Sequence, residues 1–191
     1  MSKHAPVAHG TENIRVPTAN PSAPTALNHV ALPCFDAAAT HRFYTEVLGL
    51  RLVEAFSGRS AEWGNRDYLA VSFALASGES LTFFALGNTK RPADDGLPRD
   101  IRHIALTVRS RAESDAWQRR LRAQGVDFWT EDHGGAISIY VTDPNGHVIE
   151  LTYDKLHVSA SGERAAAAVV QKWLASRSGT KRKKVSQKGR G

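Results

Sequence analysis

Two histidines and one glutamate stand at matching places in this sequence. His29 and His103 occur in nearly the same string, Leu-Asn-His-Val-Ala-Leu and Ile-Arg-His-Ile-Ala-Leu, and Glu150 lies on a later segment of alternating apolar and polar residues. Two imidazoles and one carboxylate on one side of a divalent ion leave coordination positions open for a substrate. We therefore expect these three residues to bind a metal ion together. The simpler alternative is that each histidine is a satisfied core residue and that Glu150 is a carboxylate at the rim.

Period-two alternation predicts the strands that must position these side chains. Three segments alternate in this way, at residues 103–108, 138–141 and 148–152. Such alternation is typical of half-buried strands, with one aliphatic face and one face of other residues. His103, Tyr140 and Glu150 fall on the second faces. Together they suggest a lined cavity.

Turn and cap residues predict how these strands are connected. Asp143-Pro144-Asn145-Gly146 favours a type I turn, so we expect a hairpin in which Tyr140 and Glu150 are neighbours. Ser110 and Glu113 form a capping box, which predicts a helix between the first strand and the others. The predicted order is strand, helix and three strands.

The first half of the chain repeats this order, beginning at Leu27. Asp36 is placed to cap a helix, and two alternating segments follow at residues 68–75 and 80–85. When Gly78 is aligned with Gly146, Thr82 stands opposite Glu150 and Ser72 opposite Tyr140, so the first unit lacks the carboxylate and the phenol. The expected fold is α+β: two tandem βαβββ modules that form a cavity between them, plus a C-terminal helix.

Composition and patterning divide the chain into segments. We expect a disordered N-terminal arm, a two-module domain, a helix and a disordered basic tail. Their predicted bounds are 1–26 for the arm, 27–153 for the domain (modules 27–86 and 100–153), 160–176 for the helix and 177–191 for the tail.

Charge and cysteine content bound the environment of the protein. The net charge is +6, but the tail holds seven cations and no acid, so the remaining 18 basic residues balance 19 acidic ones. We therefore expect no nucleic-acid surface on the fold, and at most a weak contact through the tail. The single cysteine, the absence of a long apolar run and the absence of a signal peptide predict a cytoplasmic protein that does not cross a membrane.

At these residues the chain resembles the vicinal oxygen chelate superfamily, which includes glyoxalase I, type I extradiol dioxygenases, fosfomycin-resistance thiol transferases and bleomycin-binding proteins. The resemblance covers Leu27 to Tyr153. Its motifs are the string around His29, Phe43-Tyr44-x3-Leu48-Gly49-Leu50, Asp132-His133-Gly134, Ser138-Ile139-Tyr140 and Asp143-Pro144-Asn145-Gly146-His147-x2-Glu150-Leu151. It implies paired βαβββ modules and a homodimer.

The resemblance is nearest in ligand pattern to the extradiol dioxygenases. It implies an oxidoreductase in which His29, His103 and Glu150 bind Fe(II), with Mn(II), Zn(II) or Ni(II) as alternatives, and in which a small catechol-like substrate is chelated through adjacent oxygens. Tyr140 would donate a hydrogen bond to the bound oxygen and His133 would shuttle a proton. The chain has no histidine between residues 86 and 102, where these enzymes have a catalytic one. The alternatives are a glyoxalase-like lyase or isomerase and a metal-free protein that binds a drug.

Overall fold

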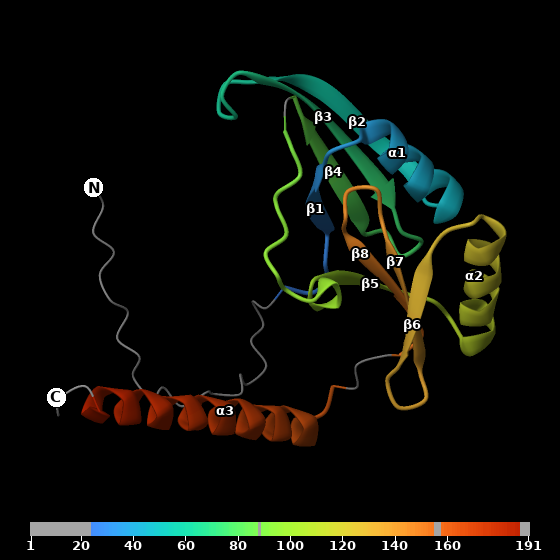
Figure 1. Ribbon diagram of the computed structural model, residues 1–191. Coiled ribbons are helices and arrows are strands. Elements are labelled where there is room, and N and C mark those ends of the chain that lie inside the picture. Colours follow the sequence, from blue (N-terminus) through green and yellow to red (C-terminus); the bar gives the residue numbers. More distant parts are fainter. Residues whose placement is uncertain (1–23, 88, 155–157, 188–191) are drawn as a thin grey trace. The chain divides into compact units, whose positions relative to one another are not determined.

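The computed structural model describes residues 24–87, 89–154 and 158–187 (Figure 1), with the side chains of the last segment described to residue 177. Residues 24–154 form one compact unit, and the C-terminal helix belongs to a second. Most of the predicted N-terminal arm, 1–26, lies outside the described residues.

The first module is a four-stranded sheet with strand order β1-β4-β3-β2, in which β1 and β4 are parallel and the other pairs antiparallel. Its elements are β1 (His29–Cys34), α1 (Ala37–Arg42), the π-helical turn η1 (Phe43–Val47), β2 (Arg51–Ser60), β3 (Arg66–Ala74) and β4 (Ser80–Leu86). The side chain of Asp36 accepts a hydrogen bond from the amide of Ala39, as expected of a cap.

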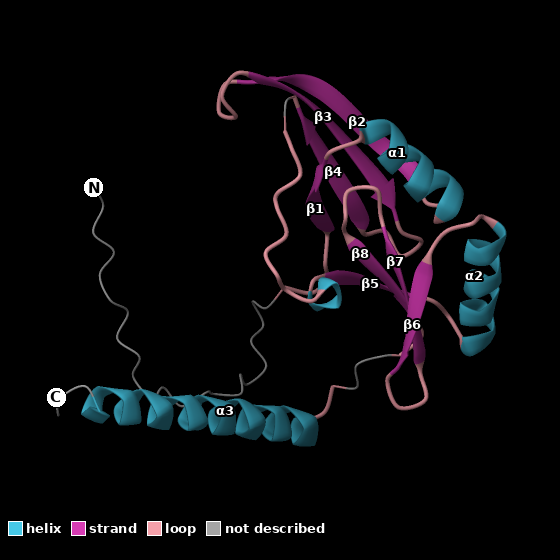
Figure 2. Cartoon of the chain, viewed as in Figure 1, coloured by secondary structure: helices cyan, strands magenta, loops and turns pink. Residues whose placement is uncertain are grey.

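The second module has the same topology, with strand order β5-β8-β7-β6 (Figure 2). Its elements are the 3₁₀ turn η2 (Arg99–Ile101), β5 (His103–Thr107), α2 (Arg111–Ala123), β6 (Phe128–Asp132), β7 (Ile137–Thr142) and β8 (Val148–Thr152). The side chain of Ser110 accepts a hydrogen bond from the amide of Glu113. The predicted tandem βαβββ architecture is therefore confirmed.

The aliphatic faces of both sheets contribute to one hydrophobic core. Buried residues of this core come from both modules, among them Phe73, Phe83, Leu121, Ile139 and Ile149. The aliphatic side chains of the strands therefore lie inward as predicted, but β8 is buried along its whole length and not on one face alone. The opposite face of each sheet, which we call its polar face, holds the histidines and the other candidate site residues.

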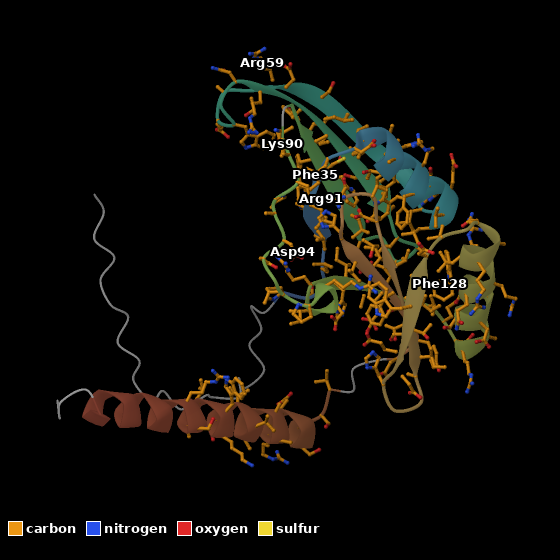
Figure 3. The ribbon with its side chains drawn as sticks, viewed as in Figure 1. Phe35, Arg59, Lys90, Arg91, Asp94 and Phe128 are labelled. Carbon is orange, nitrogen blue, oxygen red and sulfur yellow. The ribbon has the colours of Figure 1, made fainter. Side chains whose placement is uncertain are left out.

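A buried polar network joins the β7–β8 turn to the first module. Asn145 accepts a hydrogen bond from the amide of Phe35 at 2.8 Å and donates one to the hydroxyl of Thr40 at 2.8 Å. Arg91 of the linker donates to the carbonyl of Pro144. Phe35 and Arg91 are labelled in Figure 3. Because these groups come from distant parts of the sequence, the network fixes the two modules against each other.

The C-terminal helix is longer than its sequence pattern predicted. α3 runs over Ala160–Gln187 and includes the predicted helix 160–176. It continues into the segment predicted to be a disordered tail, where Lys, Arg and Gln are favourable helix formers. No helix within the described residues is both long and apolar enough to span a membrane.

Candidate functional site

His103 and Glu150 lie side by side on the polar face of the second sheet. The parallel register of β5 and β8 pairs Ala105 with Glu150, and His103 stands two residues before Ala105 on the same face. His103 Nε2 is 2.9 Å from Glu150 Oε2. Glu150 is buried, with 7% of its surface exposed, so its carboxylate has little water to compensate its charge.

The other ring nitrogen of His103 decides what this contact requires. Nδ1 lies 2.5 Å from the carbonyl oxygen of Asp100, which can only accept a hydrogen bond. Nδ1 must therefore hold the ring proton, and Nε2 of a neutral imidazole then points a lone pair at a carboxylate oxygen. Two acceptors this close need a cation between them, either an added proton or a metal ion. The pair thus fits a metal site. The Asp100 carbonyl accepts the hydrogen bond that commonly orients a metal-binding histidine.

His29 occupies the corresponding place in the first module and is prepared in a similar way. Its Nδ1 is 2.7 Å from the side-chain oxygen of Asn28, which leaves Nε2 available as a ligand, and the residue is exposed. Within the described part of a single chain, however, no three histidine, cysteine, aspartate or glutamate side chains gather closely enough to hold one ion. The structure therefore brings together His103 and Glu150 but not His29.

The register of the two sheets agrees with the alignment of the two modules. Across the second sheet the paired residues are Ala105, Glu150, Tyr140 and Trp129. Across the first sheet they are Ala31, Thr82, Ser72 and Glu54. Thr82 and Ser72 thus stand where the second module has the carboxylate and the phenol, and their hydroxyls bond each other at 2.9 Å. The first module can offer His29 but no carboxylate at this position.

Tyr140 and His133 lie next to the His103–Glu150 pair. Tyr140 is paired directly with Glu150 across the hairpin, as predicted. Its hydroxyl is 2.9 Å from His133 Nε2. Burial, with smaller contributions from the charges of Glu150 and Glu131, raises the pKa of Tyr140 to about 12. The phenol therefore stays protonated at neutral pH and can donate a hydrogen bond, while the half-exposed His133 connects it to solvent.

Two further residues lie near Tyr140, in addition to the predicted catalytic and metal-binding residues. The indole of Trp129 stacks on the Tyr140 ring, with centroids 5.1 Å apart and planes 16° from parallel. The guanidinium of Arg99 lies over the Trp129 ring at 3.8 Å. The signal available in the sequence for Trp129 was its place in a strand beside the hairpin. Arg99 lies in a polar linker without periodicity, which gives no such signal.

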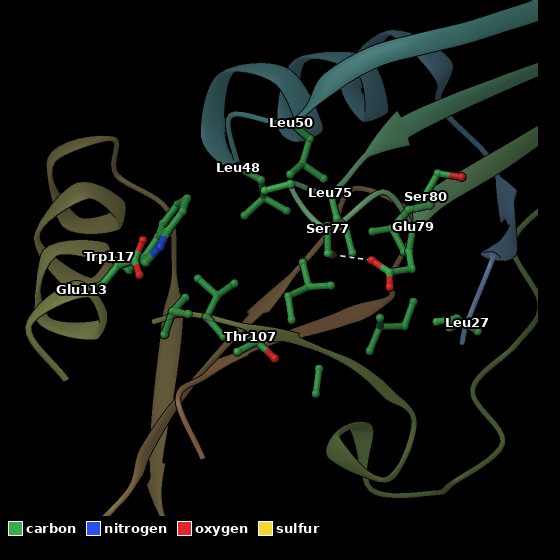
Figure 4. A pocket seen from close by; sticks show the side chains of 17 residues that line it. Leu27, Leu48, Leu50, Leu75, Ser77, Glu79, Ser80, Thr107, Glu113 and Trp117 are labelled. Atoms are coloured by element: carbon green, nitrogen blue, oxygen red, sulfur yellow. Dashed lines mark hydrogen bonds between the residues drawn. The ribbon is translucent and has the colours of Figure 1, made fainter. Parts of the chain in front are cut away.

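A cavity of about 580 Å³ lies between the modules, but none of the five predicted site residues lines it. Its walls are mainly aliphatic side chains of both modules, with Trp117 at one end (Figure 4). The sequence predicted a cavity between the modules that His103, Tyr140 and Glu150 would help to line. Within one chain the cavity lies instead on the aliphatic side of β5, because the alternation of the strand turns Ile104, Leu106 and Val108 toward it.

Comparisons with known proteins assign most of the two-module domain to a family. The family model described as glyoxalase/bleomycin resistance protein/dioxygenase superfamily matches residues 26–151. A glutathione transferase, FosA of Serratia marcescens, is 28% identical over 145 residues, which cover 74% of this chain and 86% of that protein.

Solved structures agree with this match. Lactoylglutathione lyase from Agrobacterium tumefaciens is 25% identical, with a TM-score of 0.51 and coverage of 68% of this chain and 93% of that one. A variant of the fosfomycin resistance protein FosX from Listeria monocytogenes, in complex with Mn(II) and a dihydroxypropylphosphonic acid, is 23% identical with a TM-score of 0.51, covering 70% and 96%. This chain belongs to the glyoxalase/bleomycin resistance protein/dioxygenase superfamily.

Proposed function

We propose that this protein is a metal-dependent enzyme that binds a small substrate through two adjacent oxygens. The observation that supports the proposal is the His103–Glu150 contact, in which an imidazole with its proton on the far nitrogen faces a buried carboxylate at 2.9 Å. His29 is proposed as the third ligand. The donor set of two imidazoles and one carboxylate suits Mn(II), Fe(II), Zn(II) or Ni(II).

The third ligand is proposed to come from a second copy of the chain. His29 is exposed and does not gather with His103 and Glu150 in one chain. β2 has exposed apolar side chains, with Leu52 41%, Val53 53% and Phe56 45% exposed, on a long strand at the sheet edge. Exposed apolar edges of this kind are typical of surfaces that another subunit covers. A homodimer would pair the polar face of one first module with that of one second module.

The residues around the proposed metal site have defined roles. When bound, the ion polarises the substrate oxygens and lowers the pKa of a coordinated hydroxyl. Asp100 and Asn28 hold the histidines in the ligating tautomer. Tyr140, which stays protonated, donates a hydrogen bond to a substrate oxygen. His133 exchanges a proton with solvent and with the Tyr140 hydroxyl, so the pair forms a short path along which a proton can leave or enter the site.

For the reaction, the relatives favour glutathione chemistry. The names of two of them, a glutathione transferase and a lactoylglutathione lyase, refer to glutathione or its thioesters. We therefore place first the addition of a glutathione thiol to a small electrophile, or the glyoxalase-like rearrangement of a glutathione adduct. Both reactions need a polarised substrate oxygen and a proton transfer, which the ion and the Tyr140–His133 pair would supply.

A ring-cleaving dioxygenase acting on a catechol with Fe(II), which the sequence put first, is the second candidate. The 2.9 Å contact between His133 and Tyr140 supports it, because the resemblance to extradiol dioxygenases implies catalytic roles for both residues. In that case His133 would take the proton of the substrate hydroxyl.

Metal uptake tests the proposal, and two assays separate the reactions. The metal-stripped protein should bind one divalent ion per chain by calorimetry, and His103→Ala and Glu150→Gln should abolish this binding. His41→Ala, on the exposed side of α1, is the control and should bind as the wild type does. A wild-type protein that takes up none of the four metals is a binding protein rather than an enzyme of this kind. Glutathione consumption with fosfomycin or an α-oxoaldehyde identifies the first reaction, and oxygen consumption with a panel of catechols identifies the second.

A further inference from the structure

We propose that Arg99 and Trp129 form an anion-binding subsite beside the His103–Glu150 pair, and that the substrate has a carboxylate or phosphate-type group at the end away from the metal. This inference deepens the proposed function by naming a substrate class. It depends on that function only for the orientation of the substrate, and the subsite itself can be tested without a metal.

Arg99 is held in place but has no partner for its N–H groups. The central carbon of its guanidinium lies 3.8 Å from the centroid of the Trp129 ring, a cation–π contact that uses none of the N–H donors in a hydrogen bond. Among residues 24–87, 89–154 and 158–187, Arg99 makes no hydrogen bond and no ion pair. The contact with Trp129 already restricts the Arg99 side chain, so less conformational entropy is lost when an oxyanion binds. The guanidinium can then bind a planar or a tetrahedral anion.

Neighbouring arginines of the same linker are already paired. Arg102 forms a 2.7 Å ion pair with Asp95, and Arg91 donates to the carbonyl of Pro144. The carboxylate of Glu131 on β6 accepts a hydrogen bond from Trp129 Nε1 at 3.0 Å and lies 4.0 Å from His133. This carboxylate fixes the indole ring and is engaged on both sides. Arg99 therefore differs from its neighbours in having its charge available.

The position of Arg99 connects it to the metal site in two ways. It lies in η2, the turn whose Asp100 carbonyl orients His103. In space, Arg99 lies over Trp129, and Trp129 stacks on Tyr140, the residue paired with Glu150. These planar groups therefore form a continuous row from η2 to the neighbour of Glu150. A substrate chelated at Glu150 and lying along these rings would bring its far end to Arg99. An anion there would interact with a fixed cation over a partly buried, low-dielectric ring surface.

The first experiment tests the subsite in the metal-free protein. 3-Phenylpropionate, which has a carboxylate but no chelating oxygens, is titrated while the Trp129 indole N–H resonance is followed by NMR. The resonance should shift in a saturable way in the wild type and in Arg102→Gln, and should stay fixed in Arg99→Gln. Arg99→Lys should bind several-fold more weakly, because lysine keeps the charge but not the planar stack. Phenylphosphonate in place of phenylpropionate tells whether the site prefers a phosphate-type group. An unmoved resonance with both probes in the wild type, or the same shift in Arg99→Gln, overturns the proposal.

The second experiment places the subsite relative to the metal. Mn(II)-loaded protein is titrated with 3,4-dihydroxyphenylpropionate and with its methyl ester, which share the adjacent oxygens but differ in tail charge. The acid should bind about tenfold tighter than the ester, as expected of one charge-assisted hydrogen-bonded contact. In Arg99→Gln the two should bind within about twofold of each other, with Mn(II) affinity and ester affinity unchanged. Equal binding of acid and ester to the wild type rejects the orientation. A protein that takes up none of the four metals rejects the proposed function but leaves the first experiment intact.

Discussion

Tyr44 and Asp143 come from different modules, 99 positions apart in the sequence, and the Tyr44 hydroxyl donates a hydrogen bond to Asp143 Oδ2 at 3.1 Å. Both residues are buried, and Tyr44 has no exposed surface. Asp143 also accepts hydrogen bonds from the amides of Asn145 and His147. This carboxylate is therefore the centre of the network that joins the β7–β8 turn to the first module.

Removal of the Tyr44 hydroxyl should destabilise the fold measurably. Tyr44→Phe leaves Asp143 with one donor fewer in a buried place, which costs about 1–3 kcal/mol of unfolding free energy. Urea denaturation followed by circular dichroism measures this loss. Tyr68→Phe is the matched control, because the Tyr68 ring packs against Trp63 with no described hydrogen bond to its hydroxyl, and its cost should stay below about 0.5 kcal/mol. Equal effects of the two substitutions would show that the bond to Asp143 adds nothing.

The same burial makes the fold sensitive to alkaline pH. Burial is the main cause that raises the pKa of Tyr44 above 10.0 and that of Cys34 above 9.0, so both groups are neutral in the native protein where the unfolded chain would ionise. The unfolded state then binds fewer protons, and stability falls as pH rises. For Tyr44 alone the loss should reach about 1 kcal/mol by pH 10.5. The stability difference between wild type and Tyr44→Phe should therefore shrink between pH 8 and 10.5. Parallel curves would contradict this expectation.

A site shared between two copies predicts complementation between two inactive variants. His29→Ala and Glu150→Gln each remove a ligand from every site of their own homodimers. In a mixed dimer, His29 of the Glu150→Gln chain would meet His103 and Glu150 of the other chain, which restores one site. Co-expression with two different affinity tags gives the mixed dimer, and calorimetry counts its metal ions. Each homodimer should bind none, and a mixed dimer that also binds none would place all three ligands in one chain.

Asn28 and Asp100 accept hydrogen bonds from the two histidines, but substitution of each should change the metal affinity to a different extent. Asn28 holds His29 through a side-chain oxygen, so Asn28→Ala should weaken metal binding by about tenfold or more. Asp100 holds His103 through its main-chain carbonyl, so Asp100→Ala should leave the affinity within about twofold. Competition with a chromogenic chelator measures both. The comparison fails if the two variants lose affinity equally.

Much of the fold followed from local sequence patterns. The alternation of the strands, the caps Asp36 and Ser110 and the Asp143–Gly146 turn act over a few residues, so the hairpin that pairs Tyr140 with Glu150 was predicted correctly. The alignment of the two modules also gave the register partners Thr82 and Ser72. The membership of the superfamily followed from the same motifs.

The grouping of the site residues did not follow from such patterns. Whether His29 meets His103 depends on how the modules pack against each other, and local signals such as periodicity do not encode this packing. The cavity between the modules was expected on the polar faces but lies on the aliphatic side of β5, because the contact between the modules, and not the strand pattern, places it. Arg99 was missed because its function would depend on a stack with a residue 30 positions away in the sequence, Trp129.

The two sheets have different residues at the same register position, and this difference has a consequence for the metal that the protein could bind. Thr82 occupies, in the first module, the place that Glu150 has in the second, and both belong to strands of the same geometry. If two copies combine their polar faces, a single exchange of threonine for glutamate would supply a fourth protein ligand without disturbing the other three. The duplicated architecture thus provides a position for a fourth ligand, which the single designed substitution Thr82→Glu would occupy.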